Sequence, residues 1–170
     1  GWFRSSVRVS FGCRDTGGSG LAFCPPAQII STEGANQIVT GTARDGAGNT
    51  ATATVMLNID KTRPLIAISL SPAANGAGYR NTAVTAHFTC SDSLSGVATC
   101  PADRVFATDG QQTVSGTATD RAGNSATATA TFTIDRSPPT ISTTMSRTAN
   151  ASGWFNAAVS ATFTCTDALS

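Results

Sequence analysis

Apolar and polar residues alternate with a period of two in several short segments of the chain. Residues 84–90 and 159–165 each place valine, alanine, phenylalanine and cysteine at every second position, and residues 7–13 do the same with a second valine in place of alanine. Residues 51–59 and 126–134 alternate alanine and larger apolar residues with mostly threonine. This period is typical of β-strands that have one buried and one solvent-exposed face. Because no segment carries a convincing helical stripe, the pattern predicts an all-β protein.

Turn residues separate these alternating segments. The motif Asp-x-Ala-Gly-Asn occupies residues 45–49 and 120–124, each time between two predicted strands. Glycine adopts positive φ without steric cost, and aspartate and asparagine side chains bond the local backbone. Both motifs therefore predict β-hairpins.

The chain repeats itself with a spacing of about 75 residues. Residues 41–60 align with residues 116–135 at an offset of 75, and thirteen of the twenty positions are identical. A pair of glycine and an aromatic residue recurs at Gly1-Trp2, Gly78-Tyr79 and Gly153-Trp154, and a cysteine follows each pair at Cys13, Cys90 and Cys165. Such self-similarity indicates a tandem array of one structural unit.

The phase of the repeat predicts three domains. Proline-containing segments at residues 60–64 and 135–139 are the expected joints, since proline ends a strand and stiffens the exit. Residues 1–60 are then a repeat that lacks its first strand, residues 61–135 a complete repeat, and residues 136–170 the start of a third. About seven short strands per repeat favour small Greek-key β-sandwiches. We expect the chain to be a piece of a longer array.

Composition excludes several classes of function. The net charge of +1 gives no electrostatic attraction to nucleic acid or to an anionic membrane. No apolar run approaches the roughly 20 residues that span a bilayer. The single histidine, His87, lies on the predicted polar face of a strand, and the sequence indicates no partner that would make it a general base. We therefore expect no enzymatic activity.

The cysteines predict one local disulfide per repeat. Cys13 and Cys24 bracket one loop, and Cys90 and Cys100 bracket its equivalent. Zinc binding is the rival interpretation, but four ligands at metal-binding spacing are lacking, and buried reduced thiols are the other alternative. Disulfides place the protein in an oxidising compartment. The partner of Cys165 is expected beyond residue 170.

Taken together, these motifs resemble bacterial immunoglobulin-like repeats. The shared features are Gly-Trp-Phe-Asn, Val-x-Ala-x-Phe-x-Cys-x-Asp, Gly-Thr-Ala-x-Asp-x-Ala-Gly-Asn and Ile-Asp-(Lys/Arg)-(Thr/Ser)-x-Pro, and the resemblance covers the whole chain. It implies tandem immunoglobulin-like sandwiches of a large secreted or cell-surface protein, such as an adhesin stalk. Such repeats act as spacers or adhesive modules, and some related ones bind calcium at their joints.

Calcium is therefore the candidate cofactor, although none is required by the fold. The first strand of an immunoglobulin-like sandwich begins beside its B–C and F–G loops, so each joint should approach those loops. Carboxylate and amide oxygens would then converge on a site for Ca²⁺, which prefers oxygen ligands. The alternative is that each aspartate bonds only its own loop. The candidate residues are Asp60, Asp92, Asp120 and Asn124 at the first joint, and Asp135 and Asp167 at the second.

The recurring aromatic residues also have two interpretations. Trp2, Tyr79 and Trp154 could stack on a sugar if they are exposed, or they could cover the end of each sandwich core. One such residue per repeat favours the core. Asn150-Ala151-Ser152 fits a glycosylation acceptor, but the motif is short.

Three functions remain open at this point. The first is a non-catalytic structural spacer, in which neighbouring repeats are the principal partners. The second is a glycan-binding adhesive module that uses the stacking aromatics. The third is a segment of an extracellular filament in which a strand of one copy completes the sandwich of another. The near-identity of the repeats favours the spacer, because a dedicated binding site would occur in one repeat only.

Overall fold

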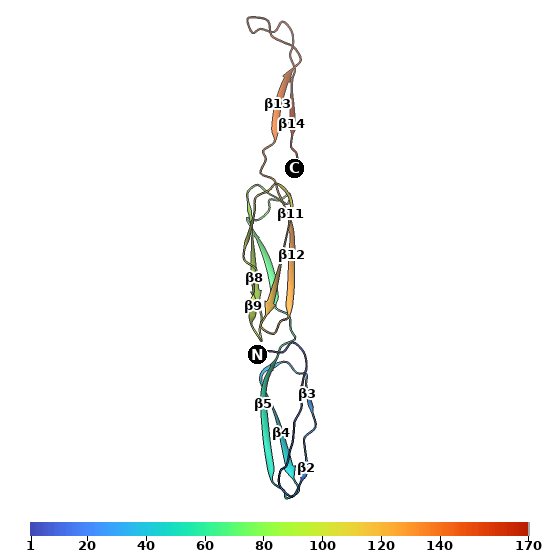
Figure 1. Ribbon diagram of the computed structural model, residues 1–170. Helices are drawn as coiled ribbons and strands as arrows, with labels where there is room; N and C mark the ends of the chain where they lie inside the picture. The colour runs from blue at the N-terminus through green and yellow to red at the C-terminus, as the bar shows by residue number, and fades with distance from the viewer. Residues whose placement is uncertain (170) are drawn as a thin grey trace. The chain divides into compact units, whose positions relative to one another are not determined.

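The structure, a computed structural model, describes residues 1–169, within which it has fourteen β-strands and no helix (Figure 1). The predicted all-β class is confirmed. The strands are β1 (Val7–Val9), β2 (Leu21–Phe23), β3 (Gln28–Ile30), β4 (Gly34–Asp45), β5 (Thr50–Ile59), β6 (Leu65–Ser71), β7 (Tyr79–Arg80), β8 (Val84–Ser91), β9 (Val97–Thr99), β10 (Arg104–Phe106), β11 (Gly110–Asp120), β12 (Ser125–Ile134), β13 (Thr140–Met145) and β14 (Ala161–Thr166).

The strands form several separate sheets. Their orders are β1-β3, β2-β4-β5, β10-β8-β6, β7-β12-β11-β9 and β13-β14. β4 and β5 pair as a long antiparallel hairpin, in which Val39 lies opposite Val55. By contrast, β7 pairs with β12 in parallel, and an isolated parallel bridge joins Phe3 to Ile59. The same short parallel pairing thus occurs at equivalent places in the first and second predicted repeats.

Contacts divide the chain into two compact units. The first comprises Gly1–Ser69, His87–Asp103 and Ser115–Thr129, and the second comprises Leu70–Ala86, Arg104–Val114 and Ala130–Ser170. The domain limits deduced from the repeat phase, at residues 60 and 135, stay a prediction. The segment around Asp60 and the loops after β8 and β11 all belong to the first unit.

The core of the first unit lies between the β4–β5 hairpin and β1. Val39, Leu57 and Ile59 are buried there, and Val7, Val9, Phe11 and Ile30 pack against them. On the opposite face of the hairpin the threonines pair across the strands: the Thr40 and Thr54 hydroxyls lie 3.2 Å apart, and those of Thr42 and Thr52 lie 3.0 Å apart. The alternation in the sequence therefore separates a buried apolar face from an exposed hydroxyl face.

Two glycines of the first unit make room for phenylalanine rings. A Cβ atom added to Gly41 would lie 2.3 Å from the Phe11 ring, and one added to Gly116 would lie 2.3 Å from the Phe88 ring. The two pairs occupy matching positions of the repeat. Each ring thus packs directly on the backbone of the facing strand.

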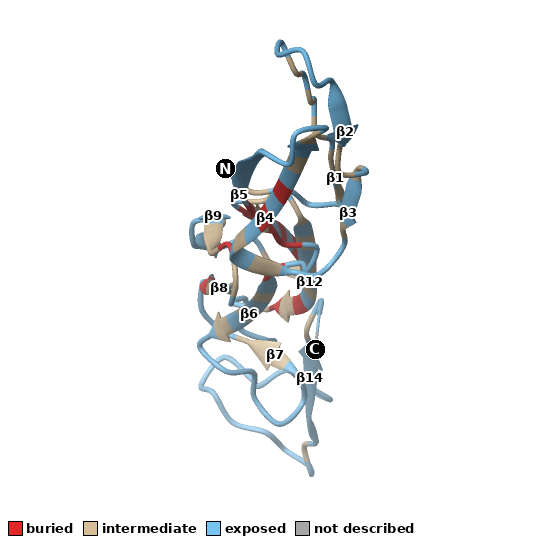
Figure 2. Ribbon diagram, turned by 90° about the horizontal axis from the view of Figure 1, so that it is seen from below, coloured by how far each residue is buried: buried red, intermediate tan, exposed pale blue. Residues whose placement is uncertain are grey.

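The second unit has its own apolar cluster. The rings of Phe106 and Phe132 meet edge to face at 5.3 Å, and the Arg80 guanidinium lies 5.6 Å from the centre of the Phe132 ring. Val114 and Ile134 are buried in the same unit. By contrast, every residue of β13 and β14 is exposed, as Figure 2 shows for β14.

Candidate functional site at the Asp60 joint

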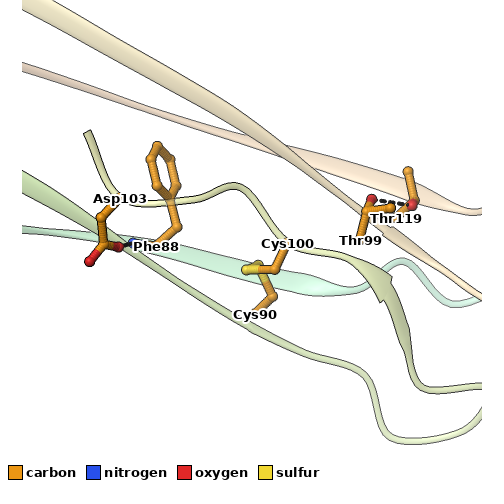
Figure 3. Close-up of a disulfide and its surroundings, with 6 residues drawn as sticks. All are labelled: Phe88, Cys90, Thr99, Cys100, Asp103 and Thr119. Carbon is orange, nitrogen blue, oxygen red and sulfur yellow. Dashed lines mark hydrogen bonds between the residues drawn. A yellow bond between two sulfur atoms is a disulfide. The ribbon is translucent and has the colours of Figure 1, made fainter.

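Each of the two predicted cysteine pairs forms a disulfide. The Cys13 and Cys24 sulfurs bond across the segment that holds β2, and the Cys90 and Cys100 sulfurs bond across the segment that holds β9. Figure 3 shows the second of these disulfides. Figure 3 also shows the Phe88 amide bonded to Asp103, and the paired Thr99 and Thr119 hydroxyls. Cys165 is a free, exposed cysteine. Disulfides of this kind are typical of oxidising compartments.

Asp60 is a fully buried charged residue at the end of β5. Its Oδ1 atom accepts a hydrogen bond from the Thr62 amide at 3.0 Å, and its Oδ2 atom accepts one from the Ser95 amide at 3.0 Å. Its main-chain carbonyl accepts a third hydrogen bond from the Asn124 side chain at 2.9 Å. The first two bonds satisfy the two oxygens of a carboxylate whose burial would otherwise be costly.

Asp92 and Asp120 each fold their own loop. Asp92 Oδ1 accepts hydrogen bonds from the Leu94 and Gly96 amides at 3.2 and 2.7 Å. Asp120 accepts from the Ala122 and Asn124 amides at 2.9 and 2.8 Å, and its other oxygen accepts from the Asn124 side chain at 2.8 Å. The local bonding that the sequence left as one alternative is therefore present.

The three aspartates nevertheless converge. One carboxylate oxygen from each of Asp60, Asp92 and Asp120 lies within 4.8 Å of the others. Asp60 and Asp120 are buried and Asp92 is half-buried. Neither salt bridge within residues 1–169 involves them. Three like charges this close repel one another in a region of reduced dielectric, so the group favours a cation in its midst.

The segment after Asp60 is also bonded to residues 31–33, which precede β4. The Glu33 carboxylate accepts a hydrogen bond from the Lys61 amide, and its two oxygens lie 3.2 and 3.1 Å from the Thr62 hydroxyl. The Lys61 ammonium donates to the Ser31 carbonyl. Residues 60–62 are thus bonded on one side to the loop before β4 and on the other to the loops after β8 and β11.

Half of this arrangement recurs at Asp135. Asp109 takes the position of Glu33: it accepts from the Arg136 Nε atom and from the Ser137 hydroxyl, both at 3.0 Å. The hydrogen bond from the Arg136 side chain, followed by that from Ser137, lowers the pKa of the Asp109 carboxyl. Asp135 accepts from the Ser137 amide, and Asp167 from the Leu169 amide. Neither belongs to the acidic group found in residues 1–169.

The three repeated aromatics do not share one environment. Trp2 and Tyr79 are half-buried, whereas Trp154 is 74% exposed. The Tyr79 backbone pairs with Thr133 in the parallel β7–β12 ladder. Trp154 lines an open hollow together with Arg147 and Asn156. Tyr79 is therefore part of a sheet, and sugar stacking stays a prediction for all three.

His87 has a partner that the sequence did not indicate. Its Nδ1 atom lies 2.6 Å from the Asp103 Oδ2 atom, and the two side chains are 46% and 51% exposed. The residues are sixteen positions apart, with no motif to connect them. His87 and Asp103 meet because the segment before β10 lies beside β8. Predicting this pair from the sequence would have required the register of β8 against β10.

Comparison with protein-family models and with curated proteins gave no match.

Within residues 1–169, no helix has the length and apolarity that crossing a membrane would require.

Proposed function

We propose that this chain is part of an extracellular structural spacer, a row of immunoglobulin-like repeats whose joints are held by side-chain contacts. The recurrence of the same contacts at repeat spacing carries this proposal. Neighbouring repeats are then the principal binding partners, and the chain needs no reaction centre.

The contacts around the two hairpin loops are the clearest case of recurrence. Asn49 bonds Asp45 through its amide and side chain, both at 2.8 Å, and Asn124 bonds Asp120 in the same way, also at 2.8 Å. Copying of structural detail along a chain is expected of repeats that serve a common mechanical role. A unique ligand site would break the pattern in one repeat.

The immunoglobulin-like part of the proposal is supported by strand order. Between residues 61 and 135 seven strands occur, in the orders β10-β8-β6 and β7-β12-β11-β9. Two antiparallel sheets, one of which also takes up a short parallel strand, are compatible with such a sandwich. The cell-surface location rests on the two disulfides, which favour secretion.

Small-angle scattering tests the spacer. The full chain is compared with a variant in which residues 61–135 are present twice in tandem. A spacer predicts that the longest dimension grows by a fixed increment with the added repeat. Growth of the radius with only the cube root of mass, as for a compact globule, would contradict it. Concentration-dependent growth of either particle would favour the filament instead.

We further propose that the Asp60 joint binds calcium. Two oxygens on opposite sides of a Ca²⁺ ion lie roughly 4.6–5.2 Å apart, given bond lengths of about 2.3–2.6 Å. The separation of at most 4.8 Å among the Asp60, Asp92 and Asp120 oxygens is compatible with such a shared ion. Bound calcium would offset the repulsion of the three carboxylates and stiffen the joint.

Melting of the full chain in calcium and in EDTA tests this site. A ligand present at about 100 times its dissociation constant stabilises by roughly 2.7 kcal/mol. We expect Asp120→Asn to abolish the calcium-dependent rise in melting temperature. Asp45→Asn, which changes the equivalent loop outside the cluster, should retain it. Identical melting of the unmodified chain in both solutions would rule the site out.

A further inference from the structure

The first repeat carries a second copy of the surface that receives Asp60. We propose that residues 15–19 and 45–49, here called the acceptor surface, bind the joint segment of an equivalent repeat attached ahead of residue 1. The ligand is an extended Ile-Asp-(Lys/Arg)-(Thr/Ser)-x-Pro peptide. This inference rests on the proposed spacer function and identifies a contact by which the array would extend.

The acceptor surface has the same internal bonding as the loops around Asp60. The Gly46 amide donates to the Gly20 carbonyl at 2.9 Å, as the Arg121 amide donates to Gly96 at 3.0 Å. The Gly17 amide donates to Asp15 at 2.9 Å, as the Leu94 amide donates to Asp92 at 3.2 Å. With the Asn49–Asp45 pair, this makes the surface a preformed equivalent of the one that Asp60 occupies.

The acceptor surface is less buried than the surface that holds Asp60, as expected if no partner covers it. Ser95 and Asp120 are buried beside Asp60. Ser19, which takes the place of Ser95, is exposed, and Asp45, the equivalent of Asp120, is half-buried. The Ser19 amide and the Asn49 side chain are therefore the donors that would receive an incoming aspartate, as Ser95 and Asn124 receive Asp60.

An orphaned polar atom lies within the same surface. Asp15 Oδ2 is buried, and it is the one side-chain atom of residues 1–169 found buried without a hydrogen-bond partner. An unsatisfied buried acceptor costs roughly 1–3 kcal/mol.

The charge of the acceptor surface predicts direct recognition of a carboxylate. Arg14 and Arg44 line a pocket of about 150 Å³ together with Asp15 and Asp45. Neither arginine belongs to a salt bridge within residues 1–169. The residues at the equivalent positions of the next repeat are the neutral Ser91 and Thr119. Guanidinium groups bind carboxylates strongly, so docking here should not depend on calcium.

The test adds a second copy of the chain's own joint segment ahead of residue 1. Residues 132–152 are added ahead of Gly1, which places an aspartate eighteen residues before Gly1, as Asp60 precedes Gly78 and Asp135 precedes Gly153. The matched control carries Asp135→Ala in the added copy only. Both extensions supply the same new strand, so they differ in one carboxylate.

Amide hydrogen exchange at Ser19 and at residues 45–49 is the readout. We expect exchange at Ser19 to be about tenfold slower with the aspartate extension than with its alanine control, the effect of one charged hydrogen bond. The difference should persist in EDTA. Equal exchange in the two extended chains would overturn the proposal.

A second measurement distinguishes a joint segment of the same chain from a joint segment of another copy. If Ser19 of the unextended chain becomes protected as its concentration rises, the acceptor surface binds other copies, and attachment ahead of residue 1 is wrong. Failure of the spacer function itself would appear in the scattering experiment, which does not involve the acceptor surface.

Discussion

The side-chain amide of Asn124 donates a 2.9 Å hydrogen bond to the main-chain carbonyl of Asp60, sixty-four residues earlier in the chain. The same nitrogen donates a 2.8 Å bond to Asp120 within its own loop. Asn49 makes the equivalent loop bond to Asp45, but it has no equivalent of Asp60 beside it. Asn49 and Asn124 thus each close their own hairpin loop, but only Asn124 also bonds the segment at Asp60.

This difference predicts unequal effects of two matched substitutions. Asn124→Ala and Asn49→Ala each remove a bond within a hairpin loop, but only Asn124→Ala also removes the bond to Asp60. We expect Asn124→Ala to lower the free energy of unfolding by about 1 kcal/mol more than Asn49→Ala does, the net value of one hydrogen bond. Urea unfolding measures both. Equal losses would mean that Asn124 contributes nothing to the joint.

The two disulfides give a second pair of matched variants. They close loops of similar length, with sequence separations of 11 for Cys13–Cys24 and 10 for Cys90–Cys100. Loop-closure entropy predicts that replacing either pair with alanine lowers the free energy of unfolding by about 3 kcal/mol. The experiment is best done with Cys165→Ser, because the free thiol could otherwise exchange. Denaturant unfolding of the unmodified chain and of each double-alanine variant measures the loss. A variant whose denaturant midpoint equals that of the unmodified chain would contradict the predicted value.

The sequence predicted the strands because apolar residues recur at every second position along them. Residues 126–134 alternate apolar residues with threonine throughout, residues 51–59 do so except at Met56 and Asn58, and both segments fall within observed strands, β12 and β5. The cysteine spacing similarly predicted both disulfides, since each pair brackets a short loop. Local pattern was sufficient wherever the partner lay close in the chain.

Features that depend on long-range register were not predictable from pattern. The approach of Asp103 to His87 needs the pairing of β8 with β10, in which Arg104 lies opposite Ala86. The role of Glu33 in holding residues 61 and 62 left no motif, because its equivalent in the next repeat is Asp109. The sequence suggested the meeting of Asp60, Asp92 and Asp120 only through a resemblance to known repeats.

The Asp109 carboxyl should titrate below its ordinary pKa of 3.8, chiefly because the Arg136 side chain bonds the charged form. A carboxyl whose pKa is lowered by folding contributes stability that is complete above the ordinary value and is lost as the pH falls through the lowered one. We expect Arg136→Gln to return the pKa toward 3.8. Carboxyl NMR titration of the unmodified chain and of the Arg136→Gln variant measures this. A pKa that stays equally low without the arginine would assign the effect to Ser137.

The contact of Gly116 with the Phe88 ring predicts how tightly each repeat is packed. A methyl group at residue 116 would lie 2.3 Å from a ring carbon, so Gly116→Ala should displace Phe88 and destabilise by about 1–3 kcal/mol. Gly41→Ala makes the same clash with Phe11. Because Phe11 is half-buried while Phe88 is buried, its ring can move outward, and we expect a smaller loss.

A second substitution separates this clash from a loss of backbone freedom. Phe88→Leu makes room at the ring position, so adding it to Gly116→Ala should cost less than the sum of the two single changes. Gly12→Ala serves as a control, since a Cβ atom there would meet nothing within 4 Å. Calorimetric melting of the five variants measures each term. Strict additivity of the Gly116 and Phe88 changes would contradict the direct contact, because overlapping groups in one core cannot act independently.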